Sequence, residues 1–99
     1  MKALVSVYGD IHGVGFRSYC KRLAQELNLG GLVRNEPDGS VKLFLGGEKT
    51  AVEKFVETVR EIKPQGFFGP QVDKVEAHFE SDVGFQPAWR NYEGFQVDY

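Results

Sequence analysis

Cysteine is almost absent from this chain, and its scarcity removes several classes of protein. The 99 residues contain a single cysteine, Cys20, so neither an intramolecular disulfide nor a metal site built from several cysteines is expected. No run of about 18 apolar residues occurs, which argues against a membrane-spanning helix. An excess of basic charge is also lacking, because the formal net charge is −2. That balance disfavours a general nucleic-acid-binding protein.

We expect no secretory signal either, since Met1 and Lys2 lead directly into a strand-like run without a long apolar region. What remains is ordinary for a globular protein: 41% of the residues are hydrophobic and 26% are charged. At this length we expect one domain over residues 1–99, with one hydrophobic core. We therefore expect a soluble, cytoplasmic monomer with no membrane or nucleic-acid partner.

Hydrophobic periodicity predicts the order strand, helix, strand, strand, helix, strand. Apolar residues recur at three- and four-residue steps in both helices and alternate with polar residues in the last strand. The predicted strands are residues 3–8, 32–35, 41–45 and 72–80, and the predicted helices are residues 16–28 and 49–62. Loops are expected at 63–71, which is rich in proline and glycine, and at 81–93. Residues 94–98 are a candidate for a short final edge strand.

This element order predicts an α+β ferredoxin-like sandwich. In that fold a βαββαβ chain forms a four-stranded antiparallel sheet with both helices on one face, and residues 94–98 would add a fifth edge strand. Cys20 lies on the apolar stripe of the first predicted helix, so we expect a buried small side chain rather than a nucleophile. The fold alone would not name an activity.

The glycine-rich stretch from Gly9 to Arg17 is the strongest candidate for a functional site. It connects the first predicted strand to the first predicted helix. Glycines let the backbone turn sharply and bring its N–H groups close to a ligand, and the start of a helix adds unpaired donors and a partial positive charge. Arg17 has a planar guanidinium that matches a phosphate, and Phe16 is expected to anchor the turn in the core. The stretch predicts a pocket for a doubly charged tetrahedral anion.

Two known phosphate-binding patterns do not fit this loop. A Walker loop ends in Gly-Lys-Ser/Thr, whereas Gly15 is followed by Phe16, Arg17 and Ser18. A dinucleotide-binding loop needs a third glycine further into the helix, and none lies at that spacing. On the loop alone, a simple glycine turn beside a surface arginine stays an open alternative.

A second stretch, from Gly31 to Val41, predicts a strand, a tight turn and a strand. Together the two stretches resemble the acylphosphatase family, whose signature is a Gly-x-Val-Gln-Gly-Val-x-Phe-Arg loop followed by a Gly-Trp-Val-x-Asn-x-x-Asp-Gly-x-Val hairpin. The matching hairpin positions are occupied by Asn35, Asp38, Gly39 and Val41. The resemblance extends to about residue 80, and acylphosphatases share the ferredoxin-like fold.

The resemblance implies an enzyme that hydrolyses the carboxyl–phosphate anhydride of small acyl phosphates, without a metal or cofactor. Arg17 would bind two phosphate oxygens, and Asn35 would orient the attacking water in line. The substrate's own phosphate would take the proton of the water. Backbone N–H groups would hold the phosphoryl group from the residues His12, Gly13, Val14, Gly15, Phe16 and Arg17. A cap for the neighbouring turn stays an alternative role for Asn35.

The chain departs from the family pattern at three positions. His12 replaces the usual Gln, Asp10 replaces a basic or neutral residue, and Leu32 replaces an aromatic residue. A carboxylate at the lip of an anion pocket is expected to weaken phosphate binding through like-charge repulsion. Residues 81–93 are also longer than is typical. These departures concern rate and substrate preference more than reaction type.

Three other interpretations stay open. The first is a non-catalytic phosphate- or anion-binding regulatory module on the same fold, which Asp10 and residues 81–93 motivate. The second is the carbamoyl-phosphate-handling domain of a hydrogenase maturation factor, a long chain with zinc-finger cysteines that are lacking here. The third is RNA binding on the sheet, although residues 42–45 lack the aromatic-glycine pattern expected there. The sequence identifies neither the physiological acyl phosphate nor the catalytic rate.

Overall fold

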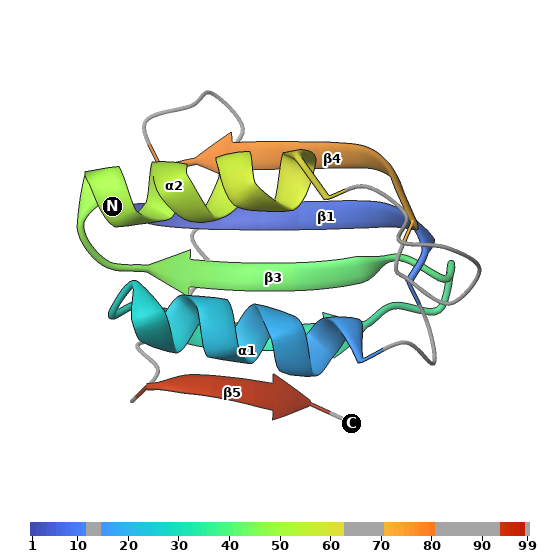
Figure 1. Cartoon of the computed structure of the whole chain (residues 1–99), viewed down its shortest axis with the longest axis horizontal. Coiled ribbons are helices and arrows are strands. Elements are labelled where there is room, and N and C mark those ends of the chain that lie inside the picture. The colour runs from blue at the N-terminus through green and yellow to red at the C-terminus, as the bar shows by residue number, and fades with distance from the viewer. Residues whose placement is uncertain (12–14, 63–70, 81–93, 99) are drawn as a thin grey trace.

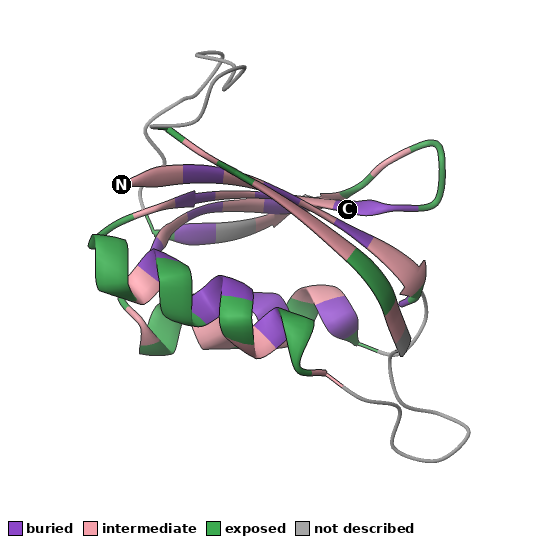
Figure 2. Cartoon of the chain, turned by 90° about the horizontal axis from the view of Figure 1, so that it is seen from above, coloured by how far each residue is buried: buried purple, intermediate pink, exposed green. Residues whose placement is uncertain are grey.

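The computed structural model describes residues 1–11, 15–62, 71–80 and 94–98 (Figure 1). The elements are β1 (Lys2–Asp10), α1 (Phe16–Glu26), β2 (Gly30–Asn35), β3 (Val41–Gly46), α2 (Lys49–Arg60), β4 (Gln71–Phe79) and β5 (Phe95–Asp98). Figure 2 shows both helices on the same face of one sheet. Neither helix has the length and apolar character that crossing a membrane requires. The predicted ferredoxin-like fold is confirmed.

The sheet has the strand order β4-β1-β3-β2-β5. Inside it, β1 pairs antiparallel with both β3 and β4, and β3 also pairs antiparallel with β2. The last strand, β5, adds to the outer edge of β2 in parallel orientation, with Gly31 opposite Phe95. The short edge strand is therefore present, and the structure supplies its partner and its direction.

The hydrophobic core lies between the sheet and the helices, because strand side chains alternate between the two faces. In β1, for example, Ala3, Val5 and Val7 are buried, and the residues between them are half-exposed. The helices add the buried side chains Phe16, Cys20 and Ala24 from α1, and Val52, Phe55, Val56 and Val59 from α2. Cys20 is buried as predicted, and burial raises the pKa of its thiol, which disfavours the nucleophilic thiolate.

The first helix ends two residues earlier than predicted, in a hydrogen-bonded cap at Asn28. Asn28 has a φ of 57°, in the left-handed region that asparagine tolerates. Its N–H donates to the carbonyl of Gln25 at 3.1 Å, and the N–H of Leu29 donates to the carbonyl of Ala24 at 2.8 Å. This is the Schellman pattern, which ends α1 and directs the chain into β2.

The second strand begins with two glycines that the periodicity did not assign to it. At Gly31 the backbone has a φ of 143°, and an added Cβ would lie 1.7 Å from the carbonyl oxygen of Phe44 in β3. The two strands therefore approach so closely that only glycine fits. Glycine is usually depleted in strands, so the sequence pattern underestimated the length of β2.

Candidate active site

The candidate site lies at the end of the sheet where β1 and β2 finish and α1 begins. Figure 1 shows that α1 runs back along the sheet, so its first turn and the last residue of β2 lie at the same end of the molecule. The predicted site residues at this end are Gly15, Phe16, Arg17 and Asn35. Three further predicted residues lie outside the described part of the chain: His12, Gly13 and Val14.

The first turn of α1 has backbone donors that its own side chains do not satisfy. Gly15, which precedes the helix, adopts a left-handed conformation with φ 75° and ψ 20°, and no side-chain hydrogen bond caps the helix. The first turn also contains no acidic residue. No side-chain cap or carboxylate of the helix therefore offsets its first N–H groups or the positive end of its dipole. Such a helix start favours a bound anion.

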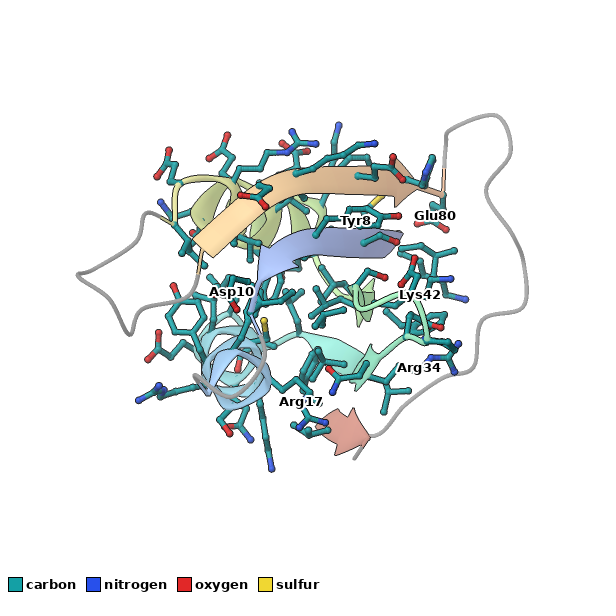
Figure 3. The ribbon with its side chains drawn as sticks, turned by 90° about the vertical axis from the view of Figure 1, so that its right-hand side faces the viewer. Tyr8, Asp10, Arg17, Arg34, Lys42 and Glu80 are labelled. Atoms are coloured by element: carbon teal, nitrogen blue, oxygen red, sulfur yellow. The ribbon has the colours of Figure 1, made fainter. Side chains whose placement is uncertain are left out.

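Phe16 and Arg17 have different environments in this first turn. Phe16 is 2% exposed and belongs to the core, so it anchors the start of the helix. Arg17 is half-buried, and Figure 3 shows its side chain on the side of α1 that faces β2 and β5. The guanidinium thus lies beside the sheet end that Asn35 terminates, rather than on the outer surface of the helix.

Asn35 is exposed at the end of β2, on the helix-covered face of the sheet. It follows the buried residue Val33 by two positions, and residues two apart on a strand share a face. Arg34 lies on the opposite face, where its Nε donates to Glu36 at 2.9 Å and its guanidinium lies 5.3 Å from the ring centre of Phe44. Asn35, and not the adjacent Arg34, therefore lies on the face of the sheet that α1 covers.

The turn after Asn35 is capped by a different side chain. The Asp38 carboxylate accepts hydrogen bonds from the backbone N–H of Ser40 at 2.9 Å and from its hydroxyl at 2.6 Å. These hydrogen bonds lower the pKa of the Asp38 carboxyl group. The N–H of Glu36 also donates to the carbonyl of Ser40 at 2.8 Å. The turn is thus held without the Asn35 side chain, which weakens the alternative role of Asn35 as its cap.

Asp10 is the acidic residue that the sequence analysis placed at the lip of the anion pocket. Asp10 is exposed as the last residue of β1, opposite Gln71 of β4 and just after a bulge. Figure 1 shows that β1 ends at the end of the molecule where α1 begins, so Asp10 lies at this end, and its repulsion of an anion stays a prediction. Within the described residues, no three side chains of His, Cys, Asp or Glu gather to form a metal site.

The arrangement of fold, loop and hairpin has a counterpart among known proteins. The family model for acylphosphatase matches residues 3–96. The chain belongs to the acylphosphatase family. An acylphosphatase of Salinibacter ruber is 40% identical over 91 residues, which are 92% of this chain and 85% of the relative. An acylphosphatase of Archaeoglobus fulgidus is 35% identical over 96 residues, 96% of this chain and 94% of the relative.

A solved structure agrees with these relatives. The crystal structure of acylphosphatase from Bacillus subtilis matches with a TM-score of 0.77 and 27% sequence identity, over 99% of this chain and 98% of that chain. Family membership confirms the predicted enzyme class: the chain is a hydrolase of acid anhydrides, and family and fold support acyl phosphate hydrolysis. The roles of Arg17, Asn35 and the loop residues stay predictions, as do the monomeric state and the cytoplasmic location.

The sequence analysis missed a cleft close to this end of the sheet. It has a volume of about 320 Å³ and lies against the turn that follows Asn35. Its walls include Ser6 and Tyr8 of β1 and Lys42 of β3. The alternation of residues in the two strands was the available signal, because it places these three polar side chains on the face that the helices leave open.

Proposed function

We propose that this chain hydrolyses small acyl phosphates by in-line attack of a water molecule on the phosphoryl group. Arg17 and the backbone N–H groups of residues 12–17 hold the phosphoryl group, and Asn35 orients the water. The start of α1 carries this proposal. There, the left-handed Gly15 precedes a first turn that lacks both a side-chain cap and an acidic residue, and Arg17 is half-buried in that turn.

The main task of the protein in this reaction is to position the phosphoryl group and the attacking water. An acyl phosphate already has a good leaving group, so a held phosphoryl group and a water in line with the breaking bond lower the barrier most. The water oxygen forms a bond to phosphorus while the bond from phosphorus to the acyl oxygen breaks. The carboxylate leaves with the bonding electrons. The family resemblance assigns the proton of the water to the substrate's phosphate, and inorganic phosphate is the second product.

The two side chains have different tasks in this scheme. The Arg17 guanidinium donates two parallel hydrogen bonds to phosphate oxygens, and each such charge-assisted bond contributes about 1.5–3 kcal/mol. The Asn35 amide accepts a hydrogen bond from the attacking water. Its exposure at the end of β2, on the helix-covered face, supports this task. The capping of the adjacent turn by Asp38 supports it further, because Asn35 is not required there.

Steady-state hydrolysis of benzoyl phosphate tests the proposal. Arg17→Ala is expected to lower kcat/KM by on the order of 10²–10³, the usual cost of losing one preorganised donor. Asn35→Ala is expected to lower kcat with little change in KM, because the water is positioned mainly in the transition state. Arg22→Ala is the matched control, since it removes an exposed arginine of the same helix, five residues further along. Its activity is expected to be unchanged.

Two results would overturn the proposal. The first is full activity of a correctly folded Arg17→Ala variant, with folding checked by circular dichroism. The second is saturable binding of inorganic phosphate to the wild-type protein without turnover of benzoyl phosphate or acetyl phosphate. That second result would identify the loop as a non-catalytic anion site.

A further inference from the structure

The cleft beside the Asn35 turn opens on the sheet face opposite the helices. We call it the open-face cleft, and its lining includes Ser6, Tyr8, Glu36, Asp38, Ser40 and Lys42. Ser6 and Lys42 are opposite each other in the β1–β3 pair. Figure 3 shows Tyr8 and Lys42 on the side of the sheet away from the helices. The cleft therefore lies across the sheet from the proposed phosphoryl site, at the same end of the strands.

The charged side chains that line the open-face cleft differ in whether they have a hydrogen-bond partner. The Glu36 carboxylate accepts a hydrogen bond from Arg34, and the Asp38 carboxylate accepts two from Ser40. Lys42 is half-buried as a residue and, among the described residues, its ammonium forms neither a hydrogen bond nor an ion pair. It acts on Asp38 only at a distance, where its positive charge helps to lower the pKa of that carboxyl group. A positive charge that lines a cleft and has no contacting partner in the described part of the chain favours an anionic ligand.

A second lysine at this end of the open face, Lys74, already forms an ion pair. Lys74 of β4 lies 2.7 Å from the Glu76 carboxylate and 5.5 Å from the ring centre of Tyr8. Its pKa is raised, mainly by the hydrogen bond to Glu76. Lys74 therefore completes a local ion pair, and it does not line the cleft. Lys42 is the lysine in this neighbourhood whose ammonium faces the cleft without a partner among the described residues.

We infer that the open-face cleft receives the acyl arm of the substrate, and that Lys42 binds a second anionic group at the far end of that arm. This inference rests on the proposed function. The turn that forms one wall begins directly after Asn35, and Tyr8 on the other wall lies two residues before the end of β1. An acyl chain that leaves a phosphoryl group at the start of α1 reaches the cleft across the ends of β1 and β3. The preferred substrates are then acyl phosphates with a distal carboxylate or phosphate.

A pair of substrates with equal chain length tests the inference. Glutaryl phosphate and pentanoyl phosphate share a five-carbon acyl chain, and only glutaryl phosphate has a distal carboxylate. After subtraction of spontaneous hydrolysis, the wild-type enzyme is expected to show the lower KM for glutaryl phosphate. Lys42→Gln is expected to raise that KM about five-fold, as for the loss of a partly exposed ion pair, with kcat unchanged. The KM for pentanoyl phosphate is expected to stay the same.

Two further variants separate a contact from a general charge effect. Lys42→Arg keeps the positive charge and is expected to retain the preference for glutaryl phosphate. Lys74→Gln removes the same charge from the same face but outside the cleft, and it is expected to leave both KM values unchanged. Equal effects of Lys42→Gln and Lys74→Gln, or equal effects of Lys42→Gln on the two substrates, would overturn the inference.

Failure of the proposed function would be visible separately, as an absence of turnover with both substrates. The cleft is then tested by binding alone, with the non-hydrolysable glutarylphosphonate and pentanoylphosphonate. In an NMR titration, saturable shifts of the Tyr8 and Lys42 amides with glutarylphosphonate, lost in Lys42→Gln, would support the subsite. Identical titrations with the two phosphonates would rule it out.

Discussion

The two helices cover the same face of the sheet, but they begin differently. α1 follows the left-handed Gly15 and has the half-buried Arg17 in its first turn. α2 follows Glu48, whose backbone is extended with φ −64° and ψ 143°. Its first residue, Lys49, is exposed and lies 3.9 Å from Glu53 on the same helix face. Of the two helices, α1 alone begins with a left-handed glycine and a neighbouring guanidinium, which together suit an anion site.

The buried faces of the helices differ as well. α2 buries four large or branched side chains, Val52, Phe55, Val56 and Val59. α1 buries one large side chain, Phe16, and two small ones, Cys20 and Ala24. The comparison suggests a division of tasks. α2 contributes mostly apolar burial to stability, whereas α1 covers part of the sheet and also provides the candidate anion site at its N-terminus. Three substitutions test this division, from the largest expected effect to the smallest.

Phe55→Ala is expected to have the largest effect, on stability alone. The side chain is 0% exposed in the core, and such truncations cost about 3–5 kcal/mol in the free energy of unfolding. Denaturant titration measures this loss. The kcat of the remaining folded enzyme on benzoyl phosphate is expected to match wild type. A stability loss no larger than that of Cys20→Ala would contradict the proposed division between the helices.

Gly15→Ala is expected to have a smaller effect on stability and a clear effect on activity. The left-handed backbone costs a residue with a Cβ about 1–2 kcal/mol, although the Cβ itself would meet nothing within 4 Å. Relaxation of that strain redirects the N–H groups at the start of α1, so kcat/KM is expected to fall. Gly94→Ala is the matched control, because Gly94 is also left-handed and unobstructed but precedes β5. A similar activity loss in both variants would speak against a role of the α1 start.

Asn28→Ala is expected to have the smallest effect, at the other end of α1. It places an ordinary residue at the left-handed position of the cap, at a cost of about 1 kcal/mol. For a domain of this size that cost corresponds to a decrease in Tm of about 4–8 °C, measured by thermal unfolding. Asn28→Gly is expected to restore the Tm, since glycine adopts this conformation freely. A Tm for Asn28→Gly below that of Asn28→Ala would refute this explanation of the cap.

The elements with a clear periodic pattern were predictable from the sequence. The alternation in β4 and the three- and four-residue spacing in both helices helped to define the order of elements, and that order led to the fold. The end of α1 was predicted only to within two residues, because Asn28 continues the polar pattern although its backbone has already left the helix. The start of β2 was missed because the reason for Gly31 is the carbonyl of Phe44, a residue distant in sequence.

The sequence named residues for the candidate site, and their roles stay predictions, but the surroundings of these residues could not be predicted. Gly15, Arg17 and Asn35 follow from local motifs, and the fold brings their elements to one end of the sheet. Asn35 lies on the same face of the sheet as Val33, two residues earlier in β2. The burial of Val33 in the structure identifies that face as the one that the helices cover. That Lys42 has no partner among residues 1–11, 15–62, 71–80 and 94–98 could not be predicted, because it depends on how the neighbouring carboxylates are already hydrogen-bonded. Pairing among polar groups of this kind is a property of the three-dimensional structure.

The parallel pairing of β5 with β2 has a consequence for synthesis of the chain. The β2–β3 hairpin is local in sequence and can form early on the ribosome, but the outer edge of β2 then presents unpaired backbone groups to other nascent chains. That edge is covered only when Phe95 has emerged and aligned with Gly31. Because such distant pairing is slow, the interval before it is when the chain is most exposed to misassembly. Emergence and docking of β5, rather than formation of the first hairpin, thus end this vulnerable period.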